Sequence, residues 1–132
     1  MKPIVVDTSV WVDWARGKNE ESLKLIHGRI IYMPSIVIME LLAGARDKHS
    51  KKTIRSTINP FIKHNRIVNP GLKDFVKAGE VLSQLKWSAS KRSNDILITV
   101  LARKIGAQVI TSNPRDFEPI CELLNIKILS FS

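Results

Sequence analysis

The sequence predicts an α/β fold with three layers, in which helices flank a central parallel five-stranded sheet, formed by one domain over residues 1–132. Short runs rich in Ile and Val alternate with longer stretches of helical periodicity, which is typical of parallel sheets with right-handed crossovers. The short runs are continuously apolar, as in strands buried on both faces. Gly and Pro lie at the ends of these segments, and 132 residues is the usual size of one domain.

Five strands and seven helices follow from this pattern. The expected strands are residues 3–6, 29–33, 66–69, 108–111 and 126–130. The expected helices are residues 9–16, 20–27, 35–46, 50–63, 72–86, 94–105 and 117–124. The helix at 72–86 is amphipathic, with Phe75 and Val76 on its apolar side and Asp74 on its charged side. Sheets of this kind bind ligands beyond the carboxyl ends of their strands.

The chain is basic, with 21 Lys and Arg residues against 12 Asp and Glu, a net charge of +9 and a pI near 10. We expect a polyanion as partner, although the same charge could serve solubility alone. The single Cys121 cannot form an internal disulfide and is expected in the core. The N-terminus lacks the long apolar stretch of a signal peptide or membrane span, so we expect a cytoplasmic protein.

Asp7 and Glu40 occupy positions suited to a site. Asp7 directly follows the first expected strand, at the carboxyl end of the sheet, although it could instead cap the next helix. Glu40 lies in residues 36–43, and the remaining seven residues of this stretch are all apolar. A carboxylate buried without partners costs on the order of several kcal/mol, so Glu40 must be ion-paired, protonated or bound to a metal.

Asp95 and Asp116 are ambiguous when each is taken alone. Asp95 opens a helix that is apolar nearly all round, but the helix dipole also favours an Asp in a first turn. Asp116 follows a turn after a strand and could cap a helix that begins at Phe117. One pocket could hold all four acids, because each follows a buried strand or belongs to a buried helix. Packed carboxylates repel one another, and Mg²⁺ or Mn²⁺ reverses that repulsion by oxygen coordination.

At these residues the sequence resembles the PIN-domain family and, within it, the VapC toxin nucleases of VapBC-type toxin–antitoxin modules. The resemblance covers essentially the whole chain. It rests on VVDTSVWVD around Asp7, on PSIVIMELLAGA around Glu40, and on NDILITVLARKIGAQVITSNPRDF, which contains Asp95 and Asp116. The resemblance implies a five-stranded parallel sheet, metal-dependent endoribonuclease activity on RNA, a homodimer, and inhibition by a cognate antitoxin.

The four acids of the family therefore correspond to Asp7, Glu40, Asp95 and Asp116 in this chain. We expect Asp7, Asp95 and Asp116 to coordinate one or two Mg²⁺ or Mn²⁺ ions, while Glu40 positions or deprotonates a bound water or joins the metal ligands.

Hydroxyl and amide side chains beside the acids also match the family. Ser9 and Asn113 are expected to orient the metal ligands, and Thr111 and Asn113 match the family's Thr-x-Asn pattern. Thr99 departs from the family, because related helices often have Ala at that position.

RNA contact is expected just before the helix that carries Asp95. There a base could stack on Trp87 while Lys91 and Arg92 hold phosphates. The alternative is a solvated loop in which Trp87 packs on the core.

Two other functions are compatible with parts of this pattern. One is a catalytically inactive RNA-binding regulatory module of the same fold, in which the acids hold a structural ion; the intact set of four acids argues against it. The other is a phosphotransferase with Asp7 as phosphate acceptor. Such enzymes usually carry a second Asp two residues on, where this chain has Ser9.

Overall fold

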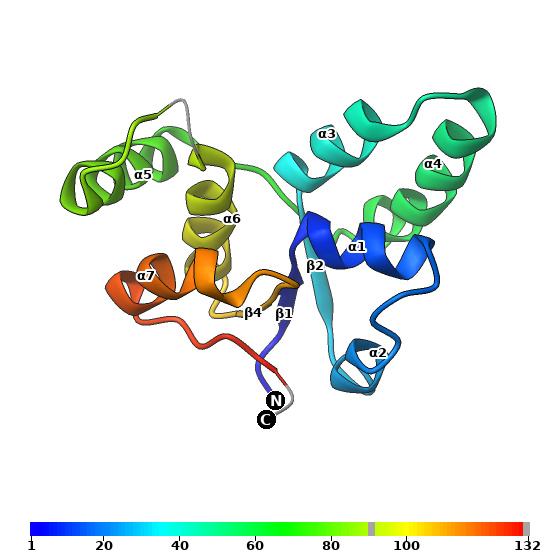
Figure 1. Ribbon diagram of the computed structural model, residues 1–132, viewed down its shortest axis with the longest axis horizontal. Helices are drawn as coiled ribbons and strands as arrows, with labels where there is room; N and C mark the ends of the chain where they lie inside the picture. Colours follow the sequence, from blue (N-terminus) through cyan, green and yellow to red (C-terminus); the bar gives the residue numbers. More distant parts are fainter. Residues whose placement is uncertain (90–91, 131–132) are drawn as a thin grey trace.

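The computed structural model describes residues 1–89 and 92–130. Within these residues, parallel strands form one four-stranded sheet in the order β3-β2-β1-β4 (Figure 1). The strands are β1 (Ile4–Val6), β2 (Ile31–Pro34), β3 (Ile67–Val68) and β4 (Gln108–Ile110). Val6 at the end of β1 pairs with Ile110 at the end of β4. The segments that leave these two strands therefore start side by side at the carboxyl edge of the sheet.

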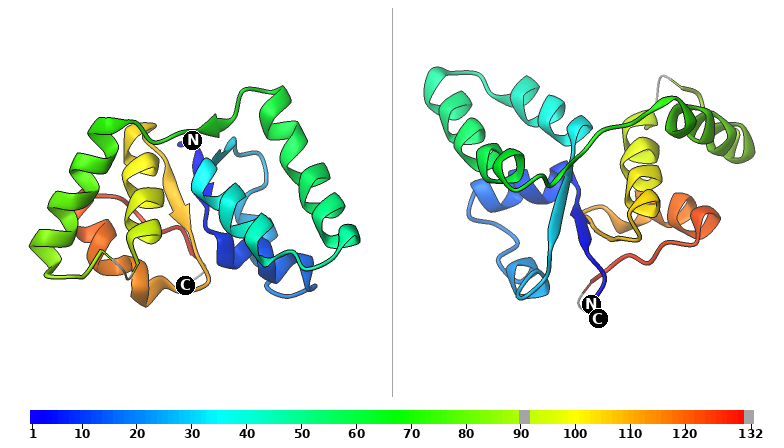
Figure 2. Two further views of the ribbon diagram at one scale, coloured as in Figure 1. Left: turned by 90° about the horizontal axis from the view of Figure 1, so that it is seen from above. Right: turned by 180° about the vertical axis from the view of Figure 1, so that it is seen from behind.

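Helices cover both faces of the sheet, which confirms the expected α/β architecture (Figure 2). One side carries α1 (Thr8–Ala15), α2 (Ser22–Leu25), α3 (Ser35–Gly44) and α4 (Lys48–Lys63). The other side carries α5 (Leu72–Leu85), α6 (Ser93–Lys104) and α7 (Pro114–Leu124). None of the helices in the described residues is long and apolar enough to cross a membrane.

The prediction of a fifth strand at residues 126–130, all of which the structure describes, is wrong. The segment runs along β4 but forms only one bridge, between Val109 and Ile128. Val109 N–H donates to Lys127 O, and Leu129 N–H donates to Val109 O. Because β4 is three residues long, only its middle residue directs its backbone groups to this edge, while its outer residues pair with β1.

The core is built largely around α6. Every residue from Ile96 to Ala102 is buried, as the apolar sequence of this helix predicts. Thr99 is fully buried, and its hydroxyl is satisfied because Oγ1 donates to the carbonyl of Asp95 at 2.8 Å. Cys121 is also a core residue, at 3% exposure, and burial raises the pKa of its thiol to about 11.

The amphipathic helix α5 buries Ala78 and Val81 in the core but leaves other apolar side chains outside it. Its apolar residues Phe75 and Val76 are about half exposed, at 53% and 54%. The acidic Asp74 faces inward, where its Oδ2 accepts hydrogen bonds from Gly71 N–H at 2.7 Å and from Lys104 Nζ at 3.0 Å. Asp74 thus links α5 to α6, and an apolar surface on α5 is left open to solvent.

Candidate active site

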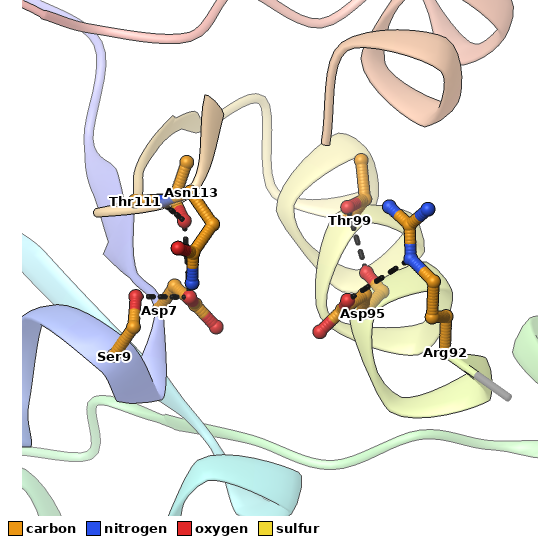
Figure 3. A network of polar contacts seen from close by, with 7 residues as sticks. All are labelled: Asp7, Ser9, Arg92, Asp95, Thr99, Thr111 and Asn113. Atoms are coloured by element: carbon orange, nitrogen blue, oxygen red, sulfur yellow. Dashed lines mark hydrogen bonds and ion pairs between the residues drawn. The ribbon is translucent and has the colours of Figure 1, made fainter. Parts of the chain in front are cut away.

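Asp7 is held at the carboxyl end of β1 by two hydroxyl groups. Ser9 Oγ donates to its Oδ2 at 2.6 Å, and Thr111 Oγ1 donates to the same oxygen at 3.0 Å (Figure 3). The residue is only 5% exposed. Asp7 is the N-cap residue of α1, yet its side chain makes no capping hydrogen bond. The capping alternative therefore does not apply, and Oδ1 accepts no hydrogen bond from the described residues.

Glu40 is connected to the region around Asp7 by a hydrogen bond from Thr8, the residue that follows Asp7. Thr8 Oγ1 donates to Glu40 Oε1 at 2.7 Å. Glu40 is partly exposed rather than fully buried, because α3 buries Ile36 and Val37 and leaves Met39 at 55% exposure. Among the described residues, the partner of this carboxylate is thus a hydroxyl group and not a basic side chain.

Asp95 enters the same region from α6. Figure 3 shows its carboxylate and that of Asp7 pointing toward each other. Burial, together with the negative charges of Asp7 and Glu40, raises the pKa of Asp95 to about 6, although the nearby Arg92 guanidinium acts in the opposite direction. The negative charge of Asp95 is therefore disfavoured in the folded protein, because burial and the neighbouring carboxylates together outweigh the effect of Arg92.

Arg92 is the cation that lies beside Asp95. Its Nε is 3.6 Å from Asp95 Oδ2, which is an ion pair but longer than a hydrogen bond. Its guanidinium carbon lies 4.2 Å from the centroid of the Trp87 ring, which is a cation–π contact. Trp87 itself packs against the core. Trp87 and Arg92, two of the three residues predicted to contact RNA, thus contact each other. The third, Lys91, lies outside the described residues.

Asp116 is separate from this cluster. It is exposed in the first turn of α7, and its carboxylate makes no hydrogen bond or ion pair with another of the described residues. Because α7 begins at Pro114 and not at Phe117, Asp116 is inside the helix and does not cap it. Asn113 is the N-cap residue of α7, and its backbone N–H donates to Thr111 Oγ1 at 3.0 Å, which extends the hydroxyl network around Asp7.

The carboxylates fit a divalent cation in the chemistry of their atoms. All the candidate ligand atoms are oxygens, Oδ1 of Asp7 accepts no hydrogen bond from the described residues, and Asp95 carries a charge that burial and its acidic neighbours destabilise. Within residues 1–89 and 92–130, no three His, Cys, Asp or Glu side chains are gathered closely enough to hold a metal ion. The structure thus brings Asp7, Glu40 and Asp95 into electrostatic contact without forming a closed cage.

Thr8, Asp13 and Ser112 are site neighbours that the sequence did not reveal. Ser112 donates from its backbone N–H to Ser9 Oγ at 3.2 Å and from its own Oγ to Asp13 Oδ2 at 2.6 Å. Thr8 could have been noticed as a hydroxyl residue directly after Asp7. The link between Asp13 and Ser112 spans 99 positions and has no local signal.

Comparisons with known proteins agree with this architecture. A family model described as the PIN domain matches residues 4–123. The structure is similar to that of a DNA-bound VapBC from Salmonella typhimurium, with a TM-score of 0.67, 24% identity and 98% of each chain covered. It is also similar to VapBC2 from Rickettsia felis bound to a promoter DNA fragment, with a TM-score of 0.69, 23% identity and 98% of each chain covered.

A third similar structure is FitAcB from Neisseria gonorrhoeae, with a TM-score of 0.70, 18% identity and 96% of each chain covered. No curated protein sequence matches the chain. The solved structures support the fold, and the family model spans nearly the whole domain, including Asp7, Glu40, Asp95 and Asp116. The chain belongs to the PIN-domain family.

Proposed function

We propose that this protein is a metal-dependent endoribonuclease and the toxin component of a type II toxin–antitoxin module. The observation that carries the proposal is the negative charge that Asp7, Glu40 and Asp95 concentrate at one end of the sheet, in a protein whose net charge is +9. An acidic pocket on a basic protein suits divalent cations that lie beneath a phosphate backbone. The similarity to proteins named VapBC and FitAcB supports the toxin assignment.

The proposed ligands of one or two Mg²⁺ or Mn²⁺ ions are Asp7, Asp95, Asp116 and Glu40. When bound, such an ion acidifies a coordinated water and stabilises charge on the attacked phosphate. Asp116 would complete the set from the first turn of α7, and its exposure leaves its side chain free to move toward the other three.

The hydroxyl groups have the task of orientation in this mechanism. Ser9 and Thr111 donate to Oδ2 of Asp7 and so orient the carboxylate, whose Oδ1 accepts no hydrogen bond from the described residues and is available to bind a cation. Thr8 holds Oε1 of Glu40, which leaves Oε2 to accept a proton from water as a general base. Asn113 supports Thr111 by its backbone N–H.

Cleavage of total cellular RNA by the purified chain tests the proposal. We expect discrete products with Mg²⁺ or Mn²⁺, none with EDTA, and a rate lower by about 100-fold or more for Asp7→Asn. Glu118→Gln is the matched control, because it neutralises an exposed carboxylate on α7 outside the cluster. Equal cleavage by folded Asp7→Asn protein would contradict the mechanism, and RNA binding without cleavage by the wild type would indicate a non-catalytic RNA-binding module.

Protein partners are part of the same proposal. We propose a cognate antitoxin and a homodimer; the exposed apolar side chains Leu72, Phe75 and Val76 of α5 favour contact with another protein. Light scattering on the purified chain tests the dimer, and a mass equal to the 14.9 kDa of one chain would contradict it. RNA contact by Trp87, Lys91 and Arg92 also remains a proposal.

A further inference from the structure

Arg92 has an unusual set of surroundings for a residue on the surface of a basic protein. Its side chain is 31% exposed, and its Nε and Nη2 are buried without a hydrogen-bond partner among the residues that the structure describes. A cation–π contact with Trp87 covers one face of the guanidinium, and Asp95 lies 3.6 Å from Nε. A buried guanidinium with unsatisfied N–H groups is held mainly by charge and stacking, and so can be replaced by a stronger cation.

The backbone at Arg92 supports the same view. Arg92 is the N-cap residue of α6 with φ of +62°, in the left-handed region that residues other than glycine seldom adopt. A strained conformation of this kind persists only when its surroundings hold it, and such positions concentrate at functional sites. From this position the guanidinium lies beside Asp95, three residues further along the helix.

We propose that Arg92 is an internal counter-ion of the carboxylate site, which competes with divalent cations for Asp95 and so sets the metal concentration at which the site fills. The inference rests on the proposed function, because it assigns the same carboxylates to metal binding. With Arg92 in place, Asp95 is partly neutralised in the metal-free protein. A divalent ion that binds near Asp95 must displace the guanidinium or accept its repulsion.

The test is the affinity for Mn²⁺, measured by electron paramagnetic resonance without RNA. Removing a unit charge a few ångströms from a divalent ion changes its binding by about tenfold, so Arg92→Ala is expected to bind Mn²⁺ about tenfold more tightly than wild type. Arg92→Lys, which keeps the charge, is expected to retain the wild-type affinity. Arg103→Ala is the matched control, since Arg103 is exposed at the other end of α6, about 16 Å along the helix and beyond the Debye length.

The melting temperature is a second measurement, which separates this role from simple packing. Arg92→Ala is expected to melt lower than wild type in EDTA and to gain more from saturating Mn²⁺. A purely structural Arg92 would lower the melting temperature equally in both conditions and leave Mn²⁺ affinity unchanged or weaker, which would overturn the inference while the nuclease proposal stands. Absence of Mn²⁺ binding to wild type, Arg92→Ala and Arg103→Ala alike would overturn both.

Discussion

Replacing Asp95 by asparagine should stabilise the metal-free protein, even though the substitution removes the ion pair with Arg92. The reason is that the folded protein disfavours the negative charge of Asp95, through burial and through repulsion from Asp7 and Glu40, by more than Arg92 favours it. Asparagine has nearly the shape of the protonated acid and carries no charge. The variant therefore escapes an electrostatic cost that the wild type bears near neutral pH.

The expected change in the free energy of unfolding follows from the shift in the pKa of Asp95. Raising the pKa of Asp95 from 3.8 to about 6 corresponds to about 3 kcal/mol between the two protonation states. The side chain is 26% exposed, so solvent screening reduces this figure, and we expect a gain of about 1.5 kcal/mol. For a domain of this size, that gain raises the melting temperature by about 5 °C.

The sign of the pH dependence is also fixed by this shift. The folded protein holds the proton on Asp95 up to about pH 6, whereas the unfolded chain loses it near pH 3.8, so the wild type loses stability as pH rises through this interval. The advantage of Asp95→Asn is therefore full above about pH 7, about half as large near pH 5, and small near pH 4.

Urea unfolding in EDTA measures this effect, because urea is uncharged and does not screen the carboxylates as a guanidinium salt would. Asp116→Asn is the control, since it neutralises an exposed acid in the first turn of α7 and should cost no more than about 0.5 kcal/mol through the helix dipole. A destabilised Asp95→Asn near neutral pH, or an equal gain near pH 4 and pH 7, would refute the reasoning.

Two further predictions concern parts of the fold outside the site. Asp74→Ala should lower the free energy of unfolding by about 2 kcal/mol, because Gly71 N–H and Lys104 lose a buried acceptor, whereas Glu80→Ala, which breaks an exposed pair, should cost less than about 0.5 kcal/mol. Hydrogen bonding from Gly71 lowers the pKa of Asp74, so its stabilisation is present above about pH 4 and should vanish in urea unfolding as acid protonates the carboxylate. Cys121, whose burial raises its pKa to about 11, should react with a thiol reagent about 100-fold more slowly in native than in denatured protein near pH 8; comparable rates would contradict its core position.

The sequence predicted those features that depend on short stretches of chain. Six of the seven residues 96–102 are apolar, which predicts a buried helix, and α6 is buried along that length. The carboxyl end of β1 had to carry Asp7, because a parallel strand with two buried faces ends where the apolar run ends. The fifth strand was not predictable in this way, since a ladder needs a partner of sufficient length and β4 spans only three residues.

The orientation of α5 shows why local pattern is insufficient. The sequence pattern places Phe75 and Val76 on the apolar side of the helix and Asp74 on the charged side. In the structure Phe75 and Val76 are about half exposed, whereas Asp74 is buried and accepts a hydrogen bond from Lys104 of α6. An amphipathic pattern indicates which side chains share a face of the helix. It does not indicate whether the surface that this face contacts belongs to the same domain or to another molecule.

By itself, the sequence determined the α/β class, the position of Asp7 directly after β1, those of Glu40 and Asp95 on α3 and α6, and membership of the PIN-domain family through motifs in a set order. Only the tertiary structure decided which partners these acids have: hydroxyl groups for Asp7 and Glu40, and a stacked arginine for Asp95. The physical reason is the separation along the chain over which each feature is determined. Periodicity and strand ends depend on neighbours along the chain, whereas electrostatic and hydrogen-bond partners depend on how distant segments pack.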